Sequence, residues 1–414
     1  MTATSSDTSK SDTRPPGIEA VDAALRSGTD SGRIPGAVGA AADSNRVLYA
    51  GASGYSNVES KTPMAVDSIG LIASMTKPIT SVAAMQQVEQ GRIELDGLVA
   101  DYLPRFADVQ VLEGFDARDK PVLRPPASPV TVRQLLTHTA GYVNEIWDSN
   151  AVRYARLGYV PSRLQGGAGF LMAPLAFDPG TSWRYSISTD VLGVLVEQVS
   201  GLPLDEYFRK HIFDPLEMRD TFFRAPEDRR PRIATVYARR PDGRLQPTPG
   251  SRAGNTFLSG GGGLMSTVGD YVRFMRALLR GGELDGHRIL ESATVETMGR
   301  NHIGRIVASG PERTAVPELS NDFGLVPDAD NRFGLGFLIF GKDRPGGHSA
   351  GTLTWGGLYN TYFWIDRSRD LCGVLLTQVL PFYDTEVLQL YGRFERAVYG
   401  AFRPGRRQEP ESPP

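Results

Sequence analysis

The chain of 414 residues has a single cysteine, five histidines and, among its 45 basic residues, only six lysines. Cys372 cannot form a disulfide within the chain, and its apolar neighbours predict a small buried hydrophobic residue. The histidines lack the short, regular spacing of metal ligands, so we expect no metal site. No run of 18 apolar residues occurs and residues 1–16 lack an apolar signal core, so we expect no membrane partner and a cytoplasmic location.

Charge of one sign does not dominate the sequence either, because 45 basic and 47 acidic residues are interspersed and leave a net charge of −2. Such a balance offers no electrostatic footprint for nucleic acid, so we expect no nucleic-acid partner. The glycine run Gly260–Gly263 lacks the lysine and hydroxyl residue that end a phosphate loop, and it predicts a tight passage of the backbone instead. We therefore expect no cofactor, and the oligomeric state stays open.

The most informative stretch is Ser74-Met75-Thr76-Lys77, which precedes a segment with apolar residues at helical spacing. Residues three apart share one face of a helix. A serine hydroxyl becomes a nucleophile when a neighbour takes its proton, and a buried lysine amine can do so. Lys77 is the only lysine with a serine three residues before it. The alternative interpretation is an N-cap serine followed by a surface lysine.

Strand and helix patterns predict a fold built from both ends of the chain. Strands are expected over Ala37–Ala42, Val47–Gly51, Phe333–Phe340, Tyr359–Asp366 and Leu371–Val379. Helices are expected over Ile18–Arg26, Ile79–Gln90, Val132–Thr137, Asp190–Val199, Leu204–Phe213, Gly269–Leu279 and Glu386–Tyr399. This order predicts an α+β fold, in which one antiparallel sheet carries helices on its faces and a mostly helical region is inserted.

The same patterns suggest one catalytic domain at 17–402, flanked by disordered tails at 1–16 and 403–414. Its α/β part covers about 17–73 and 300–402, and its helical part about 74–299. Thr267 followed by Asp270 matches a capping box at the start of a helix, so we expect a structural role for both residues.

Three further motifs contain chemically active side chains. Tyr185 follows a Pro-Gly turn and precedes a helix, where its phenol could relay a proton beside Lys77; the alternative is a half-buried core tyrosine. His138 lies where a glycine ends a helix, and we expect a satisfied structural histidine. Gly347-His348-Ser349-Ala350-Gly351 matches a nucleophile elbow, but no buried strand precedes it and no histidine follows it, so we interpret it as a turn entering a strand.

The motifs Ser74 to Lys77, Leu135 to Gly141, Tyr185-Ser186 and Trp355-Gly356-Gly357 occur in the order typical of the serine β-lactamase-like superfamily of class C enzymes and penicillin-binding proteins. Within it the chain most resembles the family VIII carboxylesterases, and residues 111–116 also resemble the fungal acyltransferases that load statin side chains. The resemblance implies a β-lactamase/transpeptidase-like fold, Ser74 as nucleophile, Lys77 as general base and Tyr185 as partner in proton transfer. It also implies an oxyanion hole from the backbone N–H groups of Ser74 and Leu358, with Trp355, Gly356 and Gly357 at the substrate.

Two departures from the lactamase pattern bear on the substrate. Tyr185-Ser186-Ile187 replaces Tyr-x-Asn and removes an amide, and Trp355 replaces the lysine of Lys-Thr-Gly and removes a cation. We therefore predict a serine carboxylesterase that hydrolyses short-chain or aryl esters through an acyl-serine intermediate, with weak or no β-lactamase activity. The alternatives are an acyltransferase with the same intermediate and a catalytically silent binding protein of this fold.

Overall fold

The computed structural model describes residues 17–249, 257–308, 311–324 and 330–402. The two predicted tails, 1–16 and 403–414, lie outside the described residues. At the centre is an eight-stranded sheet that is antiparallel throughout. Its strands, in spatial order, are β14 (Arg332–Phe333), β15 (Leu338–Ile339), β16 (Leu353–Gly357), β17 (Thr361–Asp366), β18 (Leu371–Leu376), β1 (Gly36–Ala42), β2 (Val47–Asn57) and β3 (Thr62–Pro63).

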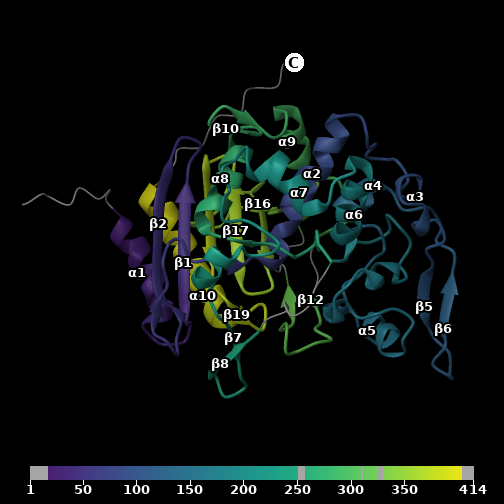
Figure 1. Ribbon diagram of the computed structural model, residues 1–414, viewed down its shortest axis with the longest axis horizontal. Coiled ribbons are helices and arrows are strands. Elements are labelled where there is room, and N and C mark those ends of the chain that lie inside the picture. Colours follow the sequence, from purple (N-terminus) through teal and green to yellow (C-terminus); the bar gives the residue numbers. More distant parts are fainter. Residues whose placement is uncertain (1–16, 250–256, 309–310, 325–329, 403–414) are drawn as a thin grey trace, which may run out of the picture.

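Both ends of the described chain contribute to this sheet, because β1 pairs with β18 as well as with β2 (Figure 1). Side chains on alternate residues of a strand point to opposite faces. On β17, Trp364 faces the helices α1 (Ile18–Thr29) and α10 (Thr385–Phe402), whereas Phe363 joins the core under α8 (Val268–Leu279). The α+β fold predicted from the sequence is therefore confirmed.

The middle of the chain carries most of the helices and lies beside the sheet (Figure 1). Besides α8, its helices are α2 (Thr76–Glu89), α3 (Val99–Tyr102), α4 (Val132–Leu136), α5 (Ser149–Arg156), α6 (Ser188–Ser200), α7 (Leu204–Phe208) and α9 (Ser292–Met298). Small two- and three-stranded sheets complete the fold: β4 (Gly70–Leu71) with β9 (Met265–Ser266), β5 (Val111–Phe115) with β6 (Pro121–Arg124), β10 (Glu283–Leu284) with β11 (His287–Arg288), β12 (Pro311–Glu312) with β13 (Phe323–Gly324), and β7 (Val236–Arg239) with β8 (Leu245–Thr248) and β19 (Val379–Leu380). Among the described helices none is both long and apolar enough to cross a membrane.

Three predicted elements differ from the structure. The strand expected over Phe333–Phe340 is a hairpin, because Gly336 adopts a left-handed φ of 98° between β14 and β15. The strand expected over Leu371–Val379 ends at Leu376, and the chain then crosses to β19, which pairs with β7. The helix expected over Leu204–Phe213 widens after Phe208 into a π-helical turn, in which the Asp214 N–H binds the Arg209 carbonyl.

Only one of the two hydrogen bonds of the predicted capping box at α8 forms. The Thr267 side chain accepts a hydrogen bond from the Asp270 N–H, as an N-cap should. The Asp270 carboxylate, however, accepts from the Asp220 N–H and the Thr221 hydroxyl, which belong to a different part of the helical region. Burial raises the pKa of Asp270 to about 6. Both residues are structural, but Asp270 joins two segments instead of closing the cap.

Candidate active site

Ser74 lies where the large sheet meets the helical region. It is the middle residue of a short 3-10 turn, Ala73–Met75, that leads directly into α2. Ala73 has a φ of 43°, in the left-handed region that a residue with a Cβ seldom adopts. Strained backbone of this kind clusters at functional sites. Ser74 is half-buried and lines two cavities, so its hydroxyl is accessible from both.

The structure brings Ser74, Lys77 and Tyr185 together although Tyr185 is 108 residues from Lys77 in the chain. The Ser74 Oγ lies 2.5 Å from the Tyr185 Oη, and the Lys77 Nζ lies 2.7 Å from the same phenol oxygen. The direct distance from the Lys77 Nζ to the Ser74 Oγ is longer, at 3.4 Å. A base must lie within about 3.2 Å of the atom whose proton it takes. The phenol oxygen therefore links the serine to the amine.

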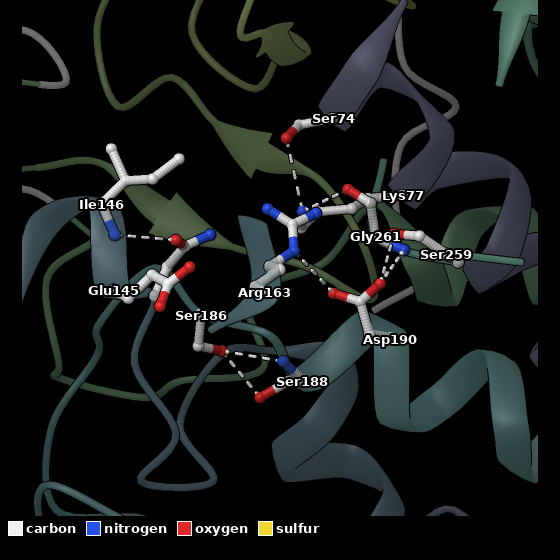
Figure 2. A network of polar contacts seen from close by, with 12 residues as sticks. Ser74, Lys77, Glu145, Ile146, Arg163, Ser186, Ser188, Asp190, Ser259 and Gly261 are labelled. Atoms are coloured by element: carbon white, nitrogen blue, oxygen red, sulfur yellow. Dashed lines mark hydrogen bonds and ion pairs between the residues drawn. The ribbon is translucent and has the colours of Figure 1, made fainter. Parts of the chain in front are cut away.

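A third contact fixes the amine of Lys77, which is only 2% exposed. Its Nζ donates to the Gly261 carbonyl at 2.7 Å, and the Gly261 N–H donates to the Asp190 carboxylate at 3.0 Å. The Ser259 hydroxyl donates to the same Asp190 oxygen, as Figure 2 shows. The second Asp190 oxygen lies 3.8 Å from the Arg163 Nε. A chain of contacts thus runs from Asp190 through the backbone of one residue, Gly261, to Lys77.

The glycine run Gly260–Gly263 is the tight backbone passage that the sequence predicts. A Cβ on Gly261 would lie 2.8 Å from the carboxyl carbon of Asp190, so no other residue fits without displacing that side chain. Gly260 contributes a carbonyl as well, which accepts from the Thr80 hydroxyl on α2. The run therefore brings two backbone carbonyls against the helix that carries Lys77.

Aromatic rings surround the phenol of Tyr185. Its ring centroid lies 5.0 Å from that of Trp355, 5.2 Å from that of Trp147 and 5.3 Å from that of His138. Tyr185 and Trp355 are both buried, and the Lys77 Nζ lies 4.6 Å from the Tyr185 ring centroid. The surrounding rings lower the effective dielectric constant near the phenol, which strengthens the electrostatic interactions there.

His138 is the structural histidine that the sequence predicts, but it belongs to the wall of this site. Its Nδ1 lies 2.8 Å from the Ser186 Oγ, which donates its own proton to Ser188, so the ring nitrogen is the donor. Burial, helped by the charge of Lys77, holds the pKa of His138 well below its ordinary value. The imidazole is therefore neutral and braces the Tyr185 ring without competing for a proton.

Two cavities of different character meet at Ser74. The first, of about 520 Å³, is walled mainly by aromatic side chains of the C-terminal part, among them Trp355, Tyr362 and Phe382. The second, of about 660 Å³, is lined by residues of the helical region, including Arg163 and Phe257. Four residues line both cavities: Ser74, Trp147, Tyr185 and Leu358. The serine can therefore reach groups bound on either side.

The other predicted substrate residues lie at the first cavity, with one exception. Trp355 and Gly356 line it, and Leu358 reaches both cavities beside Ser74. Gly357 does not line either cavity; a Cβ there would come within 2.2 Å of the carbonyl oxygen of Ile72, the residue before the turn of Ser74. The tight packing of Gly357 holds β16 against the turn that carries Ser74. Whether the N–H groups of Ser74 and Leu358 form the oxyanion hole stays a prediction.

The competing serine, Ser349, lacks the surroundings of a nucleophile. It is 3% exposed, its N–H donates to Asp366 and its hydroxyl oxygen accepts from the Arg369 Nε at 3.2 Å. The neighbouring His348 is bound to Glu395. Gly347 to Gly351 form a turn that leads into β16, which agrees with the interpretation from the sequence. Within the described residues no cluster of side chains could hold a metal ion.

Comparison with known proteins places this fold and site in a family. The family model described as Beta-lactamase matches residues 21–395. The chain belongs to the beta-lactamase family. It is similar to lovastatin esterase of Penicillium rubens, with 33% identity over 92% of this chain and 98% of the relative. The family's esterase and acyl-transfer members identify the chain as a serine hydrolase or acyl-transfer enzyme.

Two solved structures are similar along most of their length. Simvastatin synthase (LovD) of Aspergillus terreus shares 30% identity at a TM-score of 0.81, covering 94% of this chain and 99% of the other. EstCE1, described as a hydrolase with promiscuous acyltransferase activity, shares 26% identity at a TM-score of 0.72, covering 92% and 98%. The predicted resemblance to esterases and statin acyltransferases of β-lactamase fold is thus confirmed.

Sequence analysis missed two contributors to the site. Gly261 supplies its carbonyl, and a glycine run signals only that the backbone passes closely, not which polar group it presents. Asp190 lies in the first turn of α6, where an acidic residue is expected to stabilise the helix end. The pattern gives no sign that its carboxylate instead binds a segment 71 residues away.

The contacts of Asp190 predict that it positions Lys77. Asp190→Ala removes the acceptor of the Gly261 N–H and the Ser259 hydroxyl, so the Gly261 carbonyl loses its fixed direction. Misplacement of a catalytic group by about 1 Å costs on the order of 100-fold in rate, and we expect kcat to fall by about that factor. Asp190→Asn retains an acceptor oxygen and should recover most of the rate. Steady-state kinetics on an ester, with circular dichroism to verify folding, tests this; an alanine variant with unchanged kcat contradicts it.

The neutral state of buried His138 predicts a pH effect on stability. Its folded pKa is lowered, so the unfolded chain binds a proton that the folded chain does not, and stability falls as pH falls below about 6.5. We expect this group to cost about 1 kcal/mol per pH unit below pH 6. His138→Asn, a residue that tolerates the φ of 58°, should lack this component. Denaturant unfolding at pH 5, 6 and 7.5 measures it, and parallel pH curves for the two proteins would refute it.

Proposed function

We propose that the chain is a serine carboxylesterase that acts on uncharged short-chain or aryl esters. The observation that carries the proposal is the set of contacts among Ser74, Tyr185 and Lys77 at the wall of an apolar cavity. A hydroxyl, a phenol and an amine within hydrogen-bond distance form an activated nucleophile. Its position between two cavities gives room for both sides of an ester.

In the proposed reaction the Ser74 Oγ attacks the ester carbonyl carbon and forms a tetrahedral intermediate. The hydroxyl proton passes to the phenol oxygen of Tyr185 while the phenol passes its own proton to the Lys77 amine 2.7 Å away, and backbone N–H groups of Ser74 and Leu358 receive the oxyanion. The C–O bond then breaks as the same pair returns the proton to the leaving alcohol. Water repeats the sequence on the acyl-serine and releases the acid.

The walls of the first cavity favour an uncharged substrate. Trp355 presents an indole ring at the site, and Ile187 is buried in the hydrophobic core and does not line either cavity at Ser74. An anionic lactam would find neither a cation at position 355 nor an amide at position 187. An apolar acyl or aryl group instead buries surface against the aromatic wall, at about 25 cal/mol per Å².

Acyl transfer is a second candidate, and the second cavity is the observation that favours it. An alcohol bound there would lie beside the acyl-serine and could replace water as the attacking group. EstCE1, similar over most of the chain, is described as a hydrolase with acyltransferase activity. The ratio of transfer to hydrolysis products at increasing alcohol concentration measures which reaction prevails. A silent binding protein is disfavoured by the intact contacts of Ser74, Lys77 and Tyr185.

A cytoplasmic location, small-molecule esters as the partners and the absence of nucleic-acid and membrane partners remain predictions from the sequence.

Labelling of the nucleophile tests the proposal directly. A fluorophosphonate should leave its adduct on the peptide that contains Ser74, because Ser74 has the phenol of Tyr185 at 2.5 Å. Ser74→Ala and Lys77→Ala should each lose nearly all turnover of nitrophenyl butyrate, since residues that act as one unit give similar, non-additive losses. Ser349→Ala is the matched control and should remain active. An adduct on Ser349, with Ser74→Ala still active, would overturn the assignment.

The same site predicts a strong preference for esters over β-lactams. Because positions 355 and 187 offer no cation and no amide, we expect kcat/KM on nitrophenyl butyrate to exceed that on nitrocefin by several orders of magnitude. The rate that Ser74→Ala shows on each substrate is subtracted as the background. Comparable values on the two substrates would show that the aromatic wall does not select against charge.

A further inference from the structure

A polar group lies in the wall of the first cavity, on segments other than those that carry Ser74 and its partners. The turn Gly347 to Gly351 places His348 in this wall, and α10 presents Glu395 behind it. Glu395 is fully buried, and its Oε1 lies 2.6 Å from the His348 Nδ1. The other oxygen accepts from Arg344 at 2.7 Å. No step of the proposed ester hydrolysis uses this cluster.

The geometry fixes how His348 presents its ring. The partner of Nδ1 is a carboxylate that is paired with Arg344, so the Nδ1–H donates to Glu395 and Nε2 is the ring nitrogen left to bind a ligand. The ring stacks on Phe340 at a centroid distance of 3.9 Å and an angle of 13°, which prevents rotation. Nε2 has no hydrogen-bond partner among the described residues, and it is not one of their fully buried polar atoms. Nε2 is therefore the ring nitrogen that is accessible from the cavity.

The charges around His348 favour a neutral ligand group. Arg344 and Lys342 contribute two positive charges at this end of the cavity, and they pair with Glu395 and Asp330. Asp343 adds a further negative charge. These five side chains sum to one negative formal charge, so an anionic group gains nothing here. A hydroxyl or an amide N–H, in contrast, can donate to Nε2.

The cavity wall near His348 defines the rest of the ligand. Apolar and aromatic side chains line this part of the cavity, including Phe340, Leu388 and Tyr391. A flexible apolar chain or a ring fits such a wall, and a polar group in the middle of that chain would lose its hydration without compensation. Only the end that reaches His348 gains a partner.

We propose that His348, held by Glu395, determines specificity by accepting a hydrogen bond from a hydroxyl or amide N–H at the far end of an apolar ester substrate. The inference rests on the proposed function, because it names the substrate class of the same cavity. His348 is thus a binding residue, and Glu395 positions it.

Matched esters test the proposal on the unmodified enzyme. One series consists of nitrophenyl esters of alkanoic acids of increasing length, with ω-hydroxy, ω-methoxy and ω-carboxylate counterparts of equal heavy-atom number. A second series carries the same end groups on the alcohol side of butyrate esters. We expect the hydroxyl to raise kcat/KM about 3- to 10-fold, as one neutral hydrogen bond does, and to do so only near one chain length and in one of the two series. The methoxy ester lacks the donor and should lose this advantage.

Variants then locate the acceptor. His348→Phe keeps a ring on Phe340 and removes the nitrogen. The ratio of kcat/KM for the hydroxy ester to that for the methoxy ester should therefore fall to about 1, while the alkyl esters keep the order of kcat/KM that they have with the unmodified enzyme. Ser349→Ala, whose side chain does not line the cavity, is the matched control and should keep the preference. Should His348→Phe not fold, the comparison of hydroxy with methoxy esters on the unmodified enzyme still decides.

Each outcome has one meaning. Absence of nitrophenol release from every nitrophenyl ester would contradict the proposed function. Hydrolysis without a hydroxyl preference at any length in either series would overturn the role of His348 alone. A stronger preference for the ω-carboxylate would show an anion site instead, and a hydroxyl preference that persists in His348→Phe would place the acceptor elsewhere; both results overturn the inference.

Discussion

The rest of the site depends on the burial of one amine. A lysine removed from water must have its donors satisfied, because an unpaired charge or polar group in the interior costs several kcal/mol. Lys77 meets this constraint with the Gly261 carbonyl and the Tyr185 phenol, and more weakly with Ser74. Each partner comes from a different segment, so the amine can be buried only when the turn of Ser74, the loop of Tyr185 and the glycine run meet. The folded site is thus assembled around Lys77.

The sequence separation between the contacting residues explains why local patterns predict only part of the site. Ser74 and Lys77 are three residues apart, so their shared helix face follows from geometry alone. The strands over 37–42 and 359–366 also follow from local patterns, because buried strands are continuously apolar. The positions of Tyr185 and Trp355 were inferred from motif resemblance, since no local rule places residues more than 100 positions away beside a serine.

Local sequence patterns do not predict which of two possible partners a polar side chain binds. Asp270 could close a cap or bind the segment at Asp220, and the buried amide and hydroxyl there are the partners it binds. His348 could belong to an elbow or pair with α10, and the fully buried Glu395 decides. In both cases the preference comes from burial of a polar group elsewhere in the fold. The residues next to Asp270 or His348 in the sequence do not indicate that distant partner.

The two cavities at Ser74 also differ in the part of the chain that builds them. Apart from the four shared residues, the first is lined by residues 323–391, and the second almost wholly by residues 71–265. A substitution, an insertion or an exchanged segment in one part therefore reshapes one chamber and leaves the other as it was. Four residues, Ser74, Trp147, Tyr185 and Leu358, line both cavities, so a change in either part leaves the reacting groups in place. Natural variation can thus alter the two cavities independently of each other.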